Sequence, residues 1–287
     1  MFRFPTRILK ITLRVFPVLL ICCPTLSTAA AEPEPTLQIG SKTYTASELL
    51  SRPDVENITI TNDPTYGRTM QYRALKAANL FGATGFGQDD VIQFRCEDGF
   101  VAPISKDRIM DLGPNRSTAY IAIEDPKARW PDLPLKGHTG TAGPFYLVWL
   151  RPELSQILQE EWPFKIVGFD VKGSIRELYP KIIPKNQSDP KVVRGLKLFQ
   201  MTCFACHSMN RQGPSQVGPD LNLPMNPTEY FKDALLPRYI PDPKSVRSWD
   251  GSKMPGFDSQ TFSDQDIADV IAYLREMAAE RPQTVLK

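Results

Sequence analysis

The sequence predicts two differently built parts: an N-terminal α+β domain of mixed strands with few helices, followed by an all-α domain. Two patterns support this expectation. Segments rich in β-branched and aromatic residues recur between residues 57 and 171 and are separated by turn residues, as in a strand-dominated fold. Beyond residue 189, apolar residues instead recur every three or four positions, which is the spacing of one helix face. The length of 287 residues suits two domains of ordinary size.

Changes in composition suggest the domain boundaries. The segment 179–189 combines prolines and lysines with Asn and Ser and has no periodic apolar pattern, so it is the expected linker. We therefore divide the chain into a leader at 1–31, an α+β domain at 32–178, the linker at 179–189 and an all-α domain at 190–287.

The leader has the composition of a secretory signal peptide. A basic start precedes an apolar run at 15–23, and small residues follow at 27–31. We expect cleavage after Ala31, with Ala29 as the alternative. The apolar run is too short to span a bilayer, so we expect a periplasmic protein with no membrane span after cleavage. Four of the 34 basic residues lie in the leader, which leaves 30 against 32 acidic residues. This near-neutral balance gives no indication of a nucleic-acid partner.

The α+β domain is expected to begin with a small hairpin at 37–44, a helical turn at 46–50 and a half-buried strand at 57–61, where isoleucines alternate with polar residues. Helical spacing of apolar residues predicts a helix at 72–81, with Gly82 as its C-terminal stop. The pair Asp98-Gly99 is a strong signal for a hairpin between the strands predicted at 91–96 and 100–104. Further strands are predicted at 91–96, 100–104, 120–123, 145–150 and 165–171.

Two helices are predicted in the all-α domain. Asp189 can cap the first, which has Pro at its first position, a preferred arrangement. Gly195 lies on this helix and would allow another helix to approach closely. Ser263 and Asp266 form a capping box for the second helix. The apolar face of the first helix consists of Val192, Val193, Leu196 and Phe199, and that of the second consists of Ile267, Val270, Ile271, Leu274 and Met277.

A Cys-Phe-Ala-Cys-His motif at 203–207 organises this domain. Two thiols three positions apart, followed by a histidine, are the attachment signature of c-type haem. Each thiol can add to one vinyl group of the porphyrin, and the adjacent histidine can bind the iron. The alternatives are two structural cysteines or half of a zinc site. A zinc site would need two more Cys or His ligands, and His138 is the only other histidine.

Residues 190–287 resemble a small class I c-type cytochrome domain. The resemblance implies one covalent haem c on Cys203 and Cys206, with His207 as the proximal iron ligand. It also implies that Pro219 offers its carbonyl to the second nitrogen of His207, which would fix the ring plane. Besides the 203–207 motif, the resemblance is carried by Gly195, Phe199, Gly-Pro-Asp-Leu at 218–221, Lys-Met-Pro-Gly-Phe at 253–257 and Tyr-Leu at 273–274.

Four methionines after the motif are candidates for the sixth iron ligand. Met254 matches the Met-Pro ligand segment of the family and is the expected ligand, with Met225 as the alternative in a second Pro-rich loop. Met209 follows the motif too closely to reach the opposite face of a haem. Met277 lies on the apolar face of the last helix and is expected in the core. His138 is a further alternative that would have to come from the other domain.

Residues 36–175 resemble the molybdopterin-binding domain of the sulfite oxidase type in two segments, 94–100 and 143–148. In true members a cysteine near the position of Cys96 binds molybdenum. This domain is smaller, and the His and Arg cluster that would hold the pterin phosphate is not recognisable, since only His138 is present. The leader also lacks an adjacent arginine pair, which favours export of the unfolded chain. We therefore expect a docking or scaffolding module without molybdopterin, in which Cys96 is structural.

The expected function is that of a monohaem c-type cytochrome that carries single electrons between redox partner proteins, rather than an enzyme. One alternative is a molybdopterin-dependent oxidoreductase that uses Cys96 and passes electrons to a built-in haem c. Another is a haem-based sensor or assembly factor, which would need an open sixth position at the iron.

Overall fold

The computed structural model describes residues 33–81, 90–135, 138–215, 217–232, 234–249, 251–252, 254–259 and 262–282. The predicted leader therefore lies outside the described residues. From Glu34 onward the chain forms one compact unit, and this unit contains two hydrophobic cores. We call the core built between Leu37 and Phe169 the first core, and the core built between Ile182 and Met277 the second core.

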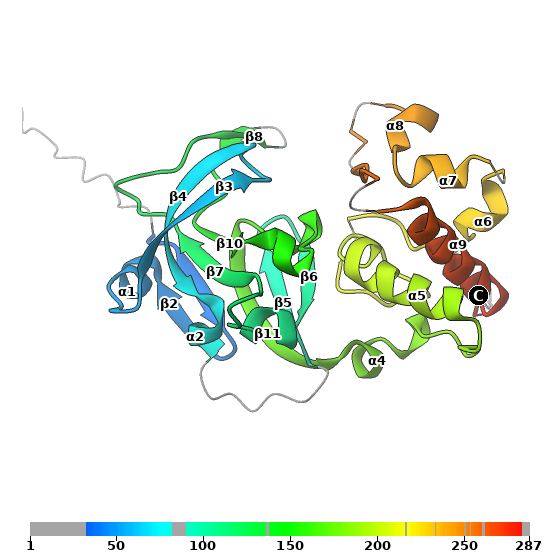
Figure 1. Ribbon diagram of the computed structural model, residues 1–287, viewed down its shortest axis with the longest axis horizontal. Coiled ribbons are helices and arrows are strands. Elements are labelled where there is room, and N and C mark those ends of the chain that lie inside the picture. Colours follow the sequence, from blue (N-terminus) through cyan, green and yellow to red (C-terminus); the bar gives the residue numbers. More distant parts are fainter. Residues whose placement is uncertain are drawn as a thin grey trace, which may run out of the picture. The chain divides into compact units, whose positions relative to one another are not determined.

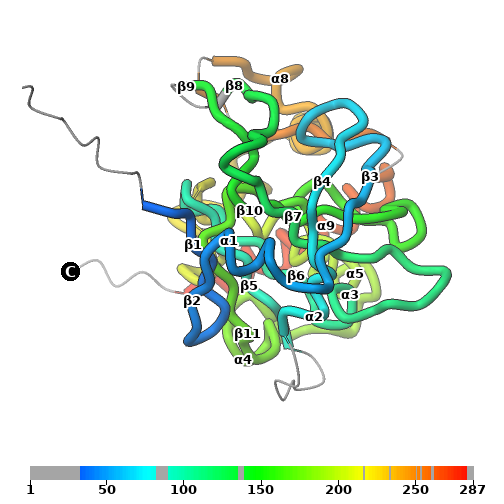
Figure 2. The backbone as a smooth tube through the Cα atoms, turned by 90° about the vertical axis from the view of Figure 1, so that its left-hand side faces the viewer, coloured from blue at the N-terminus to red at the C-terminus, as the bar shows by residue number. Residues whose placement is uncertain are grey.

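The larger sheet of the first core has five strands in the order β2-β1-β11-β5-β6 (Figures 1 and 2). β1 and β11 run parallel, and the other neighbours run antiparallel. The strands are β1 (Thr36–Ile39), β2 (Lys42–Thr45), β5 (Asp90–Cys96), β6 (Val101–Ser105) and β11 (Ile166–Ser174).

The second sheet is antiparallel, with the order β10-β7-β4-β3. Every residue of β7 is buried, as is every residue of β10 except Leu150, so both strands are continuous apolar runs. The strands are β3 (Glu56–Asp63), β4 (Arg68–Lys76), β7 (Thr118–Ile123) and β10 (Phe145–Leu150), and a separate pair is formed by β8 (Leu133–Leu135) and β9 (His138–Gly140).

The helix predicted at 72–81 is wrong over its first half. Residues up to Lys76 belong to β4, and only Ala77–Phe81 form a helix, α2. Burial alternates along β4, with Met70, Tyr72 and Ala74 facing the core, and the strand pairs with both β3 and β7. Tertiary pairing thus outweighs the local helical spacing. The expected stop at Gly82 lies outside the described residues.

The other predictions for this region are confirmed. The hairpin at 37–44 is β1 and β2, the helical turn is α1 (Ala46–Leu50), and the strands predicted from 91 onward coincide with β5, β6, β7, β10 and β11. The Asp-Gly turn joins β5 to β6 as expected. Several short elements had no clear signal in the sequence: β8, β9, α3 (Lys106–Met110) and α4 (Ile175–Leu178).

Helices make up the regular structure described after residue 189. The Asp189 side chain accepts a hydrogen bond from the Lys191 amide at 2.8 Å, and Ser263 forms the predicted capping box with Asp266. Val193 is a correction, because it is 41% exposed while the rest of its predicted face is buried. No described helix has the length and apolar composition needed to cross a membrane. The elements are α5 (Pro190–Leu198), the π-helical turn η4 (Phe199–Cys203), α6 (Pro227–Tyr230), α7 (Leu236–Tyr239), α8 (Pro243–Val246) and α9 (Asp264–Ala279).

Gly195 lies where α5 crosses α9, as its position in the sequence predicts. A Cβ atom at this position would overlap the carbonyl group of Asp269 and would lie 2.8 Å from the Cβ of Tyr273. Beside the crossing, the guanidinium of Arg194 donates to the buried carboxylate of Asp269 at 2.7 Å. The missing side chain therefore brings the two helices close enough for this ion pair.

The segment predicted as the linker packs against the second core. Ile182 is fully buried in the second core, and its carbonyl accepts a hydrogen bond from the Tyr273 hydroxyl at 2.8 Å. Tyr179 packs edge-on against Phe204, while its hydroxyl accepts a hydrogen bond from the Gln93 amide in β5 at 2.7 Å. Tyr179 at the start of the segment therefore contacts a residue that precedes the segment in the chain, Gln93, and a residue that follows it, Phe204.

Candidate haem-binding site

The 203–207 motif forms a tight turn at the end of η4. The amide of His207 donates to the Cys203 carbonyl at 2.8 Å, and the amide of Cys206 donates to the same carbonyl at 3.1 Å. Both cysteines are free thiols and half-buried. This turn brings both thiols and the imidazole together within five residues.

Phe204 anchors the motif in the second core. The side chain is fully buried, and its ring centroid lies 5.0 Å from that of Tyr179 and 5.5 Å from that of Phe199. Phe199 in turn lies 5.1 Å from Tyr273 of α9. The residue between the two cysteines is thus held by aromatic contacts that connect it to the last helix.

His207 is oriented by the residues that follow it in the chain. Its Nδ1 lies 2.8 Å from the carbonyl oxygen of Pro219, so Nδ1 carries the hydrogen and Nε2 is the nitrogen available to a metal. Gly218 packs directly on the ring, because a Cβ atom there would lie 2.6 Å from Nδ1 and 2.9 Å from Nε2. The Gly218 amide also donates to the Cys206 carbonyl at 2.7 Å. The Gly-Pro pair therefore determines the ring plane.

Asp220 holds the loop that carries this pair. Its carboxylate accepts five hydrogen bonds, from the Ser208 hydroxyl and from the backbone amides of Asn210, Arg211, Asn222 and Leu223. A carboxylate with this many donors is strongly fixed. Asp220 belongs to the segment that carries the resemblance, but sequence reasoning assigned it no role.

Buried asparagines, which sequence reasoning missed, connect the same loop to α9. The Asn222 amide donates to Asn210 at 2.8 Å and to the Met277 carbonyl at 2.7 Å. The Asn226 amide donates to Asn222 and to the Leu274 carbonyl, both at 2.9 Å. The only signal in the sequence is the Asn-Pro pair at 226–227, which indicates a helix start and not a buried network.

The structure separates the four methionines by burial. Met209 and Met277 are buried in the second core, where their side chains serve packing. Met225 is 49% exposed, whereas Met254 is half-buried. His138 begins β9, and its side chain lies outside what the structure describes.

Burial is the main cause of the pKa shifts at the motif. Burial raises the pKa of the Cys203 thiol to about 12 and that of Cys206 to about 11, and the negative charge of Glu160 adds to both shifts. Burial also lowers the pKa of His207. The imidazole is therefore neutral at pH 7, which is the form that binds a metal.

Cys96 occupies a different environment at the end of β5. It is 7% exposed and belongs to the first core. Burial raises the pKa of its thiol well above the usual range, even though the Phe164 backbone forms a hydrogen bond with it. The structure thus places Cys96 as a neutral, buried thiol among apolar side chains.

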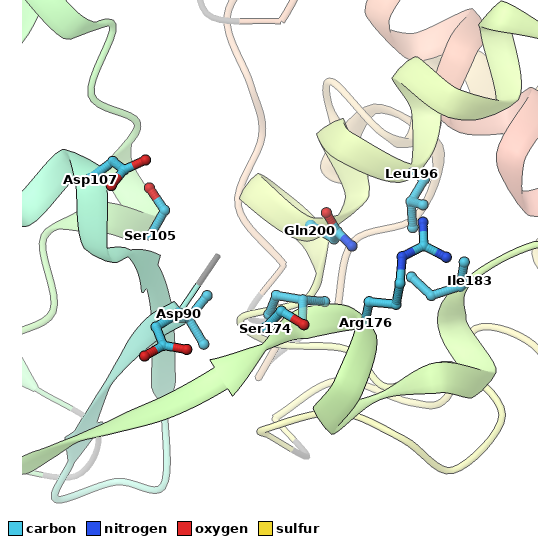
Figure 3. A pocket seen from close by; sticks show the side chains of 10 residues that line it. Asp90, Ser105, Asp107, Ser174, Arg176, Ile183, Leu196 and Gln200 are labelled. Atoms are coloured by element: carbon cyan, nitrogen blue, oxygen red, sulfur yellow. The ribbon is translucent and has the colours of Figure 1, made fainter. Parts of the chain in front are cut away.

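A cavity of about 360 Å³ lies where α5 and the segment 174–176 meet β5, β6 and α3 (Figure 3). Its lining mixes polar and aliphatic side chains, and none of the predicted haem ligands or thiols contributes to it. It is lined by Asp90, Val91, Ser105, Asp107, Ser174, Ile175, Arg176, Ile183, Leu196 and Gln200.

Comparison with known proteins identifies the part of the chain that contains the site. The family model described as cytochrome c matches residues 192–278. No curated protein and no solved structure matches the chain. The matched segment contains both thiols, His207, Pro219 and Met254. The C-terminal part of the chain is therefore a c-type cytochrome domain, which implies haem c as its cofactor and haem-based electron transfer as its chemistry.

Proposed function

We propose that the chain is a periplasmic monohaem cytochrome that carries single electrons between redox partner proteins. The observation that carries this proposal is the arrangement at His207. Its Nδ1 is bonded to Pro219, Gly218 packs on the ring, and two free thiols lie within the same turn. This donor set suits a covalently attached porphyrin with a single axial imidazole.

In this proposal four side chains hold the haem. Cys203 and Cys206 form thioether bonds, His207 binds the iron through Nε2, and Met254 supplies the sixth ligand. Bound haem c accepts and donates one electron at the iron. The chain's own contribution is to fix the imidazole, to exclude water through the aromatic contacts of Phe204, and to close the coordination sphere.

The choice of Met254 is supported by burial. A sixth ligand has to turn inward from its loop, and Met254 is half-buried where Met225 is 49% exposed. The amide of Phe257, three residues later, donates to the Pro241 carbonyl at 2.8 Å, which helps to hold the Met254 loop. A six-coordinate iron with these ligands suits electron transfer, whereas a sensor would keep one position open.

We call the part of the chain from β1 to β11 the β-rich region. We assign it a docking or scaffolding role, as a cofactor-free relative of the sulfite oxidase type. The burial of Cys96 in the first core supports a structural role for this thiol rather than metal ligation. If the region instead bound molybdopterin, natively expressed protein would contain about one molybdenum per chain. That molybdenum content, measured by elemental analysis, would favour the alternative of a molybdopterin-dependent oxidoreductase.

The test of the main proposal is covalent haem attachment. On a denaturing gel the wild-type chain should retain haem-dependent peroxidase activity, and the Cys203→Ala/Cys206→Ala variant should not. Complete extraction of haem from the wild type by acidified acetone would overturn the proposal. Finding the mature N-terminus at residue 32 in a periplasmic fraction would support the proposed location.

A further inference from the structure

The chain directly after the motif makes a tight turn with an unfavourable backbone conformation. Met209 and Gln212 exchange two backbone hydrogen bonds, at 2.9 and 3.0 Å. The two residues between them, Asn210 and Arg211, both have positive φ angles, 55° and 63°. An arginine rarely adopts this left-handed conformation, so other contacts must hold the turn.

The carboxylate of Asp220 provides these contacts. Its Oδ2 accepts a hydrogen bond from the Arg211 amide at 2.6 Å and one from the Ser208 hydroxyl at 3.0 Å. Its Oδ1 accepts a hydrogen bond from the Asn210 amide at 3.2 Å. These three bonds fix the part of the chain that directly follows His207.

The same carboxylate also holds the chain that follows Pro219. Its Oδ1 accepts hydrogen bonds from the amides of Asn222 and Leu223, at 2.8 and 2.9 Å. Pro219 directly precedes Asp220, and its carbonyl oxygen lies 2.8 Å from Nδ1 of His207. Asp220 therefore connects the two segments that carry the donor and the acceptor of this bond.

We propose that Asp220 is a positioning residue for electron transfer, because it holds the Pro219 carbonyl against His207 and thereby keeps the reduction potential of the haem low. This inference rests on the proposed function, since it requires the iron to be bound at Nε2 of His207. It goes beyond that function by giving a residue that touches neither the iron nor the thioethers control over the redox equilibrium.

The sign of the effect follows from the charge of the oxidised haem. Oxidation leaves one additional positive charge at the iron, and the bound imidazole shares part of it. A hydrogen bond is stronger when its donor is charged, so the bond to Pro219 stabilises the ferric protein more than the ferrous protein. The difference between charged and neutral hydrogen bonds corresponds to roughly a fivefold change in an equilibrium. For a one-electron couple, a fivefold change is about 40 mV.

The experiment uses the full-length protein with haem attached, and measures midpoint potentials by spectroelectrochemistry for the wild type, Asp220→Asn and Asp220→Glu. Asparagine places an NH₂ group where Oδ2 accepts from the Arg211 amide, so the turn is released. Glutamate keeps the charge but moves the carboxylate outward by one methylene group. Both variants should raise the ferrous-to-ferric ratio at a fixed applied potential, by roughly fivefold.

The control variant makes the same change of charge elsewhere in the domain. Asp264 is exposed in the first turn of α9, and Asp264→Asn should have the potential of the wild type.

Comparison of the two Asp220 variants separates positioning from charge. If Asp220 acted only through its negative charge, Asp220→Glu would have the wild-type potential and only Asp220→Asn would shift. That pair of results would overturn the inference. Ser208→Ala covers the case in which neither Asp220 variant folds. It removes one of the five donors to the carboxylate and should give a smaller shift in the same direction.

A second readout reports on the hydrogen bond itself. In the reduced protein, the Nδ1 proton of His207 can be followed by NMR. Its exchange with D₂O should be roughly tenfold faster in the Asp220 variants than in the wild type, because the bond to Pro219 opens more easily.

Wild-type exchange rates in the Asp220 variants, with or without a shift in potential, would contradict the inference. If Ser208→Ala is the only variant that folds, a wild-type potential together with a wild-type exchange rate in this variant would also contradict it. Absence of covalent haem in the wild type would instead reject the proposed function, before any potential is measured.

Discussion

The regions around the first core and the second core satisfy their polar side chains in different ways. In the first core the Asp63 carboxylate accepts hydrogen bonds from Tyr72 at 2.7 Å, from Tyr146 at 3.2 Å and from two backbone amides at 2.9 Å. All of these partners lie within the β-rich region. In the second core His207 has one ring nitrogen bonded to Pro219, and its other nitrogen is the one available to iron.

This difference separates a polar side chain that stabilises the fold from one that is available to a ligand. Both carboxylate oxygens of Asp63 already accept hydrogen bonds from the protein. Asp63 therefore stabilises the fold rather than binding a ligand. The backbone around His207 is instead shaped to hold one side chain, because Gly218 packs on the imidazole ring. The carboxylate of Asp220 accepts hydrogen bonds from five donors and so holds the loop that carries Gly218. Small substitutions around the second core should therefore disturb the haem-binding site. Small substitutions in the first core should only lower the free energy of unfolding.

The largest effect is expected at the crossing of α5 and α9. In Gly195→Ala the new methyl group overlaps the Asp269 carbonyl, so the helices must move apart, and we expect a loss of about 3 kcal/mol in the free energy of unfolding. Denaturant titration followed by tryptophan fluorescence and haem absorbance measures this loss. Val193→Ala, at an exposed position of the same helix, is the control. Equal midpoints for the two variants would contradict the close helix packing.

The next largest effect is expected at the ring of His207. In Gly218→Ala the methyl group clashes with the imidazole, at an overpacking cost of about 2 kcal/mol. The haem should stay attached through its thioethers, while the proximal bond weakens and the ferric spectrum becomes high-spin in part. Val217→Ala, at the exposed neighbouring position, should leave the spectrum unchanged. An unaltered low-spin spectrum in Gly218→Ala would mean that the ring can move away at no cost to the site.

A smaller effect on stability, with a clear spectroscopic signature, is expected at the sixth ligand. Met254→Ala should abolish the weak near-infrared band of sulfur ligation in the oxidised protein, and should lower the reduction potential because the thioether stabilises the ferrous state. Met225→Ala, at the more exposed methionine, should retain the band. The opposite pair of results would assign the ligand to Met225.

The smallest effect is expected in the first core. Cys96→Ala removes one buried sulfur, so we expect a loss of about 1 kcal/mol in the free energy of unfolding. Haem content and reduction potential should not change, as measured by the pyridine haemochrome spectrum and by redox titration. A change in either of them, with stability intact, would show that the β-rich region takes part in redox chemistry through this thiol.

The sequence is most informative where the causes are local. The cap at Asp189, the capping box at Ser263 and the hairpin between β5 and β6 each depend on a few adjacent residues, and all three are present. Tyr72 is different, because its conformation depends on pairing with Ile58, fourteen residues earlier in the chain.

The contact between Arg194 and Asp269 joins residues that are 75 positions apart. During synthesis the 203–207 motif therefore emerges well before α9, the helix whose Tyr273 and Asp269 complete the packing around Phe199 and Gly195. Until that helix arrives, the loop held by Asn222 and Asn226 also lacks its two carbonyl partners. Both thiols of the motif are consequently made before the helix that completes the packing around Phe199.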